Sequence, residues 1–319
     1  MKTNRLLPLC LAAALLLGLT ACAKAGPSPT PSPPAAPAPS ASATPGTDVV
    51  TALDNESCLI RVLGVEPEAE AGYSVNAELT NRSKRPIRFG LRHAAVNGVQ
   101  TDPPFSEEVG AGERVKSAIT LKDEVLEYYG ITEFTDIELN FLATYADDLT
   151  AELDNNIPIH IYPLGKVTPY VRDEKDDRIL FESPSVKVSL ISYYQDRKTG
   201  FAANVHLTNK TDLPLNFTVD DAALNSLPCD PSFFVTVAPG KQLFTTLYWS
   251  PTFMTEAGVD DWFLAKGETD EPEEEIEEMS FRLRVYDSLG KQAEDMVNQE
   301  IKFTLKEEEP EPAPAPAAG

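Results

Sequence analysis

The sequence predicts an all-β protein made of two tandem antiparallel β-sandwich domains, each with one short helix. Three observations predict it. Short segments alternate apolar and polar residues, as strands with one buried face do. Gly, Pro and Asn turn residues separate these segments at short intervals. Finally, residues 72–112 recur as residues 200–240 without a gap. Because each copy holds its own set of strands, the repeat predicts a duplication of one domain rather than two different domains.

Residues 1–21 are predicted to be a lipoprotein signal peptide. A short basic start precedes an apolar stretch at 6–19, which is too short to span a bilayer as a helix. The tetrapeptide LTAC that ends at Cys22 resembles the bacterial lipobox, in which the cysteine sulfur receives a diacylglyceryl group before the chain is cut. We therefore expect Cys22 to be the lipid attachment site, carrying acyl chains such as palmitate. The alternative is an ordinary secretory signal with an incidental cysteine.

Residues 22–50 follow as the lipidated cysteine and a Pro/Ser/Ala-rich linker. This composition cannot bury a core, so we expect a disordered, extended spacer. At about 3.1 Å per residue, its stretch 26–47 reaches roughly 60–70 Å at most. Residues 307–319 are predicted to be a disordered acidic and Pro-rich tail.

The first repeat is predicted to span 51–163 and the second 181–306, with an inter-domain linker at 164–180. At a shift of 128 residues, 15 of the 41 positions between Gly72 and Gly112 are identical. The shift of 128 still holds at Tyr129-Gly130-Ile131 and then becomes 142, because 14 residues are inserted in the second copy around FLAKGETDEPEEE. The chain therefore contains a duplication of one domain.

About seven strands are expected in each repeat. Val75, Ala77 and Leu79 alternate with polar residues in the first copy, as Ala203, Val205 and Leu207 do in the second. Asn81 and Asn209 end these strands, where an Asn side chain can stabilise a turn. The segments DEVLEYYG and SPTFMTEAG are the predicted short helices, and IELNFLATY, IPIHIYP, MSFRLRVYD and QEIKFTL are the predicted closing strands. This pattern favours an immunoglobulin-like arrangement, without the paired Cys and central Trp of antibody domains.

The turn motifs resemble those of tandem immunoglobulin-like repeats in uncharacterised, clostridial-type surface lipoproteins. The resemblance rests on NKTD at 209–212, Asn97-Gly98, Asp230-Pro231 with Phe233, and APGK at 238–241, and covers about residues 55–306. It implies an immunoglobulin-like fold and a surface location. It implies no known activity and transfers no functional residue.

Charge limits the classes of partner. The chain has 27 Lys and Arg against 50 Asp and Glu, a net charge of −23. Affinity for nucleic acid depends on basic residues that neutralise phosphates, so a nucleic-acid partner is not expected. Docking on an anionic lipid surface by charge alone is equally disfavoured. The membrane contact is therefore assigned to lipidated Cys22.

No catalytic, metal-binding or cofactor-binding residue is predicted. The three histidines, His93, His160 and His206, lie far apart and are expected to face solvent. The adjacent pairs Asp147-Asp148, Asp220-Asp221 and Asp260-Asp261 do not indicate paired carboxylates, because neighbours in a strand point to opposite faces. The acidic run at 268–278 is interpreted as a solvated loop, with attraction of cations or a basic partner as the alternative.

Two cysteines and an aromatic group remain open. Cys58 and Cys229 are not equivalent between repeats, so they are either free thiols or joined across the domains. Trp249, Trp262, Tyr248, Phe244 and Phe253 gather in the second copy. A core role is favoured for the tryptophans, and a surface patch for a glycan or protein is the alternative.

The sequence as a whole predicts a non-enzymatic lipoprotein at the extracellular face of the cell membrane, more in keeping with a Gram-positive-type envelope. It is expected to act as a binding or structural module that contacts an envelope protein or glycan. Two alternatives remain: an accessory subunit or enzyme acting on cell-wall polymers, and a transporter-associated solute-binding lipoprotein.

Overall fold

The structure is a computed structural model that describes residues 49–70, 72–121, 123–196, 199–231, 233–256, 276–290 and 295–305. Cys22, the linker and the tail lie outside these ranges. By the density of contacts the chain divides at residue 40, and the unit Ser40–Gly319 holds both repeats. No helix among the described residues is long and apolar enough to cross a membrane.

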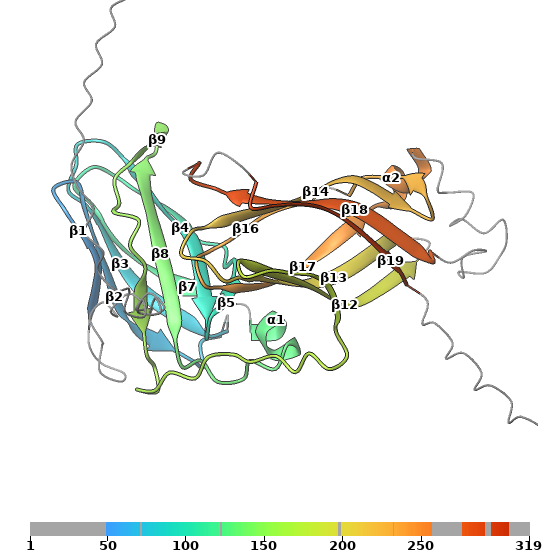
Figure 1. The fold of residues 1–319 in the computed structure, drawn as a ribbon. Helices are drawn as coiled ribbons and strands as arrows, with labels where there is room; N and C mark the ends of the chain where they lie inside the picture. The colour runs from blue at the N-terminus through green and yellow to red at the C-terminus, as the bar shows by residue number, and fades with distance from the viewer. Residues whose placement is uncertain are drawn as a thin grey trace, which may run out of the picture. The chain divides into compact units, whose positions relative to one another are not determined.

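The first repeat is a sandwich of two sheets (Figure 1). One sheet has the strand order β1-β2-β3-β7, and its neighbours are antiparallel. The other is built around β4 and β8, with the short strands β5, β6, β9 and β10 at their sides. The elements are β1 (Val50–Asp54), β2 (Cys58–Glu66), β3 (Ser74–Asn81), β4 (Ile87–Val96), β5 (Val99–Thr101), β6 (Ser106–Val109), β7 (Arg114–Thr120), α1 (Asp123–Tyr128), β8 (Ile137–Tyr145), β9 (Asp148–Glu152) and β10 (Ile159–Ile161).

The second repeat uses the same plan. Strands β11, β12, β13 and β17 form one layer, and β14, β15, β16, β18 and β19 form the other. The elements are β11 (Arg178–Glu182), β12 (Val186–Asp196), β13 (Gly200–Asn209), β14 (Leu215–Leu224), β15 (Leu227–Pro228), β16 (Phe234–Val237), β17 (Gln242–Trp249), α2 (Pro251–Glu256), β18 (Glu278–Asp287) and β19 (Val297–Thr304). The predicted all-β, immunoglobulin-like fold with two short helices is confirmed. The described strands outnumber the expected seven per repeat because short hairpin arms such as β5 and β15, of three and two residues, also form strands.

The alternation read from the sequence places the core correctly. Val75, Ala77 and Leu79 of β3 are buried in one apolar cluster. Ala203, Val205 and Leu207 of β13 are buried in a second one. Each sandwich therefore has its own core, and burial of these apolar side chains is the main force that holds its two layers together.

Two equivalent asparagines fasten the same turn in both repeats. The Nδ2 of Asn81 donates to the carbonyls of Arg85 and Val109, at 2.7 and 2.9 Å. The Nδ2 of Asn209 donates to the carbonyls of Leu213 and Val237, at 2.7 and 3.0 Å. In each repeat the Oδ1 also accepts a backbone N–H two residues later. The predicted turn role of these residues is confirmed, and these three partners differ by 128 residues between the repeats.

We predict that Asn81→Ala and Asn209→Ala each lower the free energy of unfolding by about 2–3 kcal/mol, because each leaves buried backbone carbonyls without a donor. Denaturant titration of both variants checks this. A loss below about 1 kcal/mol in both would contradict the structural role. A large loss in only one would contradict the equivalence of the repeats.

A second asparagine pair confirms where the shift changes. The Oδ1 of Asn97 accepts the backbone N–H groups of Thr135 and Asp136, at 2.9 and 3.1 Å. The Oδ1 of Asn225 accepts those of Glu277 and Glu278, at 2.8 and 3.0 Å. The asparagines differ by 128 residues and their partners by 142, as the alignment requires. Asn97 and Asn225 both have positive φ, 53° and 47°, which Asn tolerates better than most residues.

Candidate functional site

Glu138 is the centre of a buried polar cluster. Its side chain is only 7% exposed. His160 on β10 is its direct partner across the strands, and His93 on β4 is a diagonal neighbour. Nε2 of His93 lies 2.8 Å from Oε1 of Glu138, and Nε2 of His160 lies 3.4 Å from Oε2. Two histidines that are far apart in sequence therefore meet on one carboxylate, because β4, β8 and β10 are neighbours.

Lys241 of the second repeat closes this cluster. Its Nζ lies 2.6 Å from Oε2 of Glu138, and its side chain is 16% exposed. The carboxylate of Asp136 lies 2.8 Å from Nδ1 of His160 on the other side. We call these five residues (His93, Asp136, Glu138, His160 and Lys241) the junction cluster. Its cross-repeat ion pair is shielded from water and therefore stronger than an exposed pair.

The surroundings perturb two pKa values in the cluster. Burial alone would raise the pKa of Glu138, but hydrogen bonding from His93 and the charge and hydrogen bond of Lys241 outweigh it, so this pKa is lowered. The hydrogen bond to Asp136 raises the pKa of His160, and burial and Lys241 oppose this increase. Protonated His160 is thus favoured by the folded state.

We predict that the contribution of His160 to stability depends on pH. Because its pKa is raised on folding, its stabilising effect is fully present below the unfolded pKa of about 6.5 and is lost as pH rises through the folded pKa. The free energy of unfolding of the wild type should therefore exceed that of His160→Gln by more at pH 5.5 than at pH 8.5. Denaturant titrations at both pH values check this. An equal or larger difference at pH 8.5 would contradict it.

An aromatic stack also joins the repeats. The ring of Phe244 on β17 lies parallel to that of Tyr129, with centroids 3.7 Å apart and planes 4° apart. The ring of His206 also stacks on Phe244, with centroids 4.6 Å apart. Tyr170 of the segment between the repeats meets Phe244 edge-on at 5.9 Å. Phe244 also packs against the core of the first repeat, so it serves the junction rather than a free surface.

Backbone hydrogen bonds continue the junction. The N–H of Gln242 donates to the carbonyl of Gly98 at 3.0 Å, where β17 meets β5 in a short parallel contact. The side chain of Gln100 donates to the carbonyl of Thr236 at 2.9 Å and accepts from the N–H of Ala238 at 2.8 Å. One mixed sheet therefore runs from β10 to β11 through both repeats.

The expectation that the histidines face solvent is wrong. The side chains of His93, His160 and His206 are 10%, 24% and 2% exposed. His206 lies on the polar face of β13, opposite the core of its own repeat. That face is covered at the junction, which a sequence pattern within one strand does not reveal. Burial lowers the pKa of His206, and its Nε2 lies 3.0 Å from Oε1 of Gln242.

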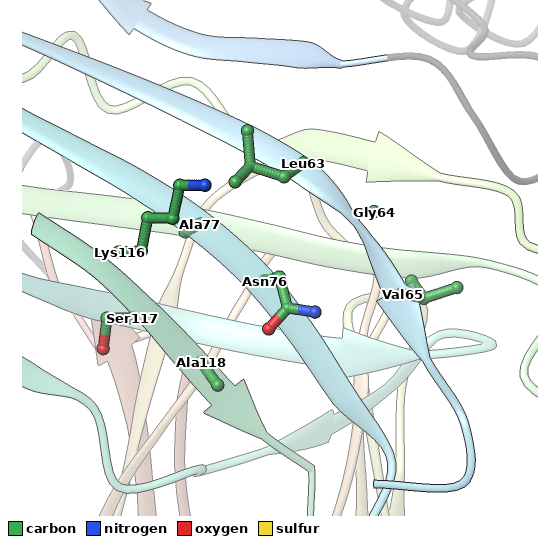
Figure 2. A pocket seen from close by; sticks show the side chains of 8 residues that line it. All are labelled: Leu63, Gly64, Val65, Asn76, Ala77, Lys116, Ser117 and Ala118. Atoms are coloured by element: carbon green, nitrogen blue, oxygen red, sulfur yellow. The ribbon is translucent and has the colours of Figure 1, made fainter.

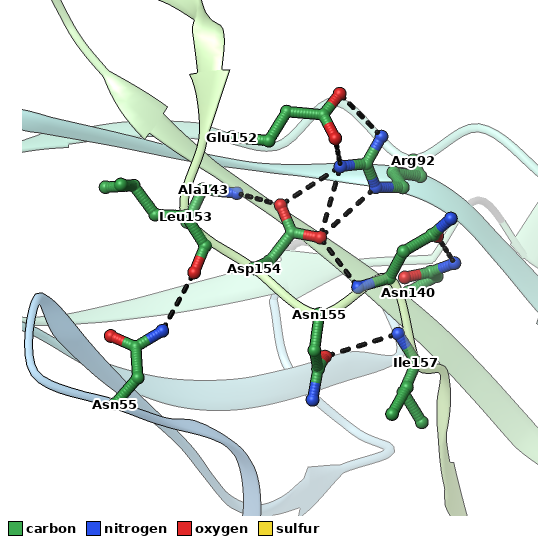
Figure 3. Close-up of polar contacts among 10 residues, drawn as sticks. Asn55, Arg92, Asn140, Ala143, Glu152, Leu153, Asp154, Asn155 and Ile157 are labelled. Carbon is green, nitrogen blue, oxygen red and sulfur yellow. Dashed lines mark hydrogen bonds and ion pairs between the residues drawn. The ribbon is translucent and has the colours of Figure 1, made fainter.

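A second buried carboxylate of the first repeat, that of Asp154, is held beside β4 and β8 (Figure 3). The side chain of Asp154 is 2% exposed, and Nη2 of Arg92 donates to both of its oxygens at 3.1 Å. The backbone N–H of Ala143 also donates to it at 3.1 Å, and that of Asn156 at 2.9 Å. Arg92 lies 2.8 Å from Glu152 as well. These contacts satisfy the carboxylate and fasten the chain that follows β9.

A shallow depression crosses β2, β3 and β7 (Figure 2). It lies at Gly64, where the register of β2 and β3 shifts by a bulge. One of its eight lining residues, Lys116, is charged, so it does not gather groups for acid–base chemistry. The lining residues are Leu63, Gly64, Val65, Asn76, Ala77, Lys116, Ser117 and Ala118.

Cys58 and Cys229 are free and buried, one in the core of each repeat. The structure therefore favours the free-thiol alternative over a bridge across domains. Burial, followed by the charge of Asp154, raises the pKa of Cys58 to about 11. Burial also raises the pKa of Cys229. Both thiols are thus protonated at neutral pH and poorly reactive.

We predict that iodoacetamide at pH 8 leaves Cys58 and Cys229 unmodified in the folded protein and labels both in denaturant without reductant. Peptide mass analysis checks each site. A label on the folded protein would contradict the burial. Failure to label in denaturant would indicate a disulfide.

The remaining predicted residues serve structural contacts or lie outside the described ranges. Trp249 is fully buried and donates from Nε1 to the carbonyl of Cys229 at 2.7 Å, which confirms its core role. Asp147, Asp220 and Asp221 pair with Arg85, Arg284 and Arg282, respectively. Cys22, Trp262, Asp260-Asp261 and most of the acidic run 268–278 are not described. In the described part of the chain, no three His, Cys, Asp or Glu side chains are placed to hold a metal ion.

Comparisons with known proteins assign the chain to no family. No family model and no curated protein matches the chain. A transglutaminase from red sea bream is 14% identical, with a TM-score of 0.19; the match covers 68% of this chain and 27% of that one. The YadV chaperone is 13% identical (TM-score 0.19; 72% of this chain and 92% of that one). The CsuC–CsuE chaperone–tip adhesion subunit complex of Acinetobacter baumannii is 11% identical, with a TM-score of 0.21. The match covers 72% of this chain and 90% of that one.

This chain thus spans about a quarter of the transglutaminase. At such identities no activity or partner is taken from these structures. The fold is an immunoglobulin-like β-sandwich, and the predicted likeness to clostridial-type lipoproteins stays a prediction.

Proposed function

We propose that the chain is a lipid-anchored extracellular lipoprotein whose joined sandwich repeats act as a binding or structural module of the cell envelope, without catalytic activity of its own. The observation that carries the proposal is the use of the junction cluster. Its two histidines and its central carboxylate are closed by Lys241 and buried between the repeats. Buried groups that are paired with one another hold the two domains together and are not accessible to a substrate.

The lipobox and the linker support the anchored location. Two or more acyl chains on Cys22 hold a protein stably at a membrane without basic residues, which suits a chain of net charge −23. The Pro-rich linker then separates the folded repeats from the bilayer. A module joined at its centre and tethered at one end is suited to present its outer faces to other envelope components.

Cell fractionation tests the anchor. The wild-type protein is expected in the membrane fraction, and Cys22→Ala is expected in the medium or the soluble fraction. Cys58→Ala is the matched control and should remain membrane-bound. Membrane retention of Cys22→Ala would contradict the anchor.

The non-enzymatic part has a separate test. Purified wild-type protein should not cleave isolated cell-wall polymer. Cleavage by the wild type that is lost in Glu138→Gln would contradict this part of the proposal and favour a wall-acting enzyme.

A further inference from the structure

Two exposed tyrosines flank β13 on the outer face of the second repeat. Tyr194 on β12 and Tyr248 on β17 are both in register with Ala202 on β13. The two tyrosines are 47% and 39% exposed, whereas Ala202 is buried. Phe201 and Ala203 belong to the core, so Ala202 points to the outer face. The small Ala202 side chain therefore lies between two larger tyrosine side chains on this face.

The two tyrosine rings are separated by one strand, and a hydrogen bond restrains one of them. Strand neighbours lie about 4.8 Å apart, so two residues separated by one strand lie roughly 10 Å apart, comparable to the length of a disaccharide. The Oη of Tyr248 donates to the carbonyl of Thr199 at 2.6 Å. A ring that is held before binding loses less conformational freedom when a ligand arrives.

A row of uncharged polar groups follows on the same face. Ser192, Asn204 and Thr246 form the next row across β12, β13 and β17. The Nδ2 of Asn204 donates to Oγ of Ser192 at 3.0 Å, and Oγ1 of Thr246 donates to Oδ1 of Asn204 at 2.8 Å. These two bonds orient the groups and use only part of the hydrogen-bonding capacity of each. Ser192 and Thr246 are exposed.

We propose that this tyrosine face (Ser192, Tyr194, Asn204, Thr246 and Tyr248, over Ala202) binds an extended neutral glycan. The C–H faces of sugar rings pack on aromatic rings, and sugar hydroxyls exchange hydrogen bonds with hydroxyl and amide groups. None of the six side chains is charged, whereas the chain carries a net charge of −23. A neutral ligand therefore meets no repulsion, while polyphosphates and polyuronates do.

Isothermal titration of the full chain in mild detergent with chitohexaose and with cellohexaose tests the proposal. We expect the wild type to bind at least one of them. We expect Tyr194→Ala and Tyr248→Ala each to weaken that binding about ten-fold. Tyr248→Phe, which keeps the ring, should retain most of the affinity. The matched control is Tyr128→Ala at the end of α1, where the side chain is 80% exposed, and it should bind as the wild type does.

A second measurement does not depend on variants. The bound hexasaccharide should protect Tyr194 and Tyr248, but not Tyr128, from nitration in the wild-type protein. Absence of binding to both hexasaccharides would overturn the proposal, as would wild-type affinity in both alanine variants or binding to polygalacturonate alone. Because the protein is detergent-solubilised, these outcomes are independent of lipidation at Cys22.

Discussion

Arg92→Ala is expected to lower the free energy of unfolding by about 3–5 kcal/mol, which is the usual cost of leaving a buried carboxylate without its charged partner. Asp154 is 2% exposed, and Arg92 donates to both of its oxygens. The backbone donors at Ala143 and Asn156 would remain, but they do not neutralise the charge. Denaturant titration at pH 7 measures the loss.

The matched control is Arg88→Ala on the same strand, β4. Arg88 lies 3.3 Å from Glu108, and the two side chains are 43% and 54% exposed. Exposed pairs contribute about 0–1 kcal/mol, so this variant should stay close to the wild type. Equal effects of Arg88→Ala and Arg92→Ala would show that the burial of Asp154 does not set the cost.

Lys241→Met is expected to destabilise the protein by about 3 kcal/mol, at the low end for a broken buried pair, because His93 and His160 still face Glu138. The loss should fall on the junction between the repeats. A double-mutant cycle with Glu138→Gln measures the coupling directly, and we expect at least about 1 kcal/mol.

The control for this cycle is the exposed pair of Lys166 and Glu133, at 2.8 Å, whose side chains are 53% and 65% exposed. Its coupling should be well below that of Lys241 and Glu138. Zero coupling between Lys241 and Glu138 would contradict a stabilising ion pair between the repeats.

The sequence was informative wherever a pattern is local. Alternation identified the buried faces of β3 and β13, because the side chains of a strand alternate with a period of two. The duplication aligned Asn81 with Asn209 as turn residues at strand ends, and the two side chains bond to equivalent carbonyls. Short helices were expected where α1 and α2 lie, because alternation stops there.

The junction could not be predicted in this way. Glu138 appears in the sequence as an ordinary polar position of an alternating strand, and Lys241 as part of a turn motif. Their contact depends on how the two repeats meet, and neither periodicity nor the alignment of one repeat on the other contains that information. One available signal was Phe244, an apolar residue on the polar phase of β17, which favours cover at its own position.

The tyrosine face could be predicted from the sequence only in part. The sequence showed that aromatic residues gather in the second repeat, but it did not separate buried Trp249 from exposed Tyr248. Strand phase assigns them to opposite faces once β17 is placed. The pairing of Tyr194 with Tyr248 across Ala202 needed the strand order β12-β13-β17, which a linear sequence does not show.

Mass analysis of the N-terminal peptide from isolated membranes is the most direct test of the central claim, that this is a lipid-anchored module. We expect a peptide that begins at Cys22 and carries a diacylglyceryl group on its sulfur. An N-terminal peptide that begins at another residue, or that begins at Cys22 with an unmodified thiol, would contradict it.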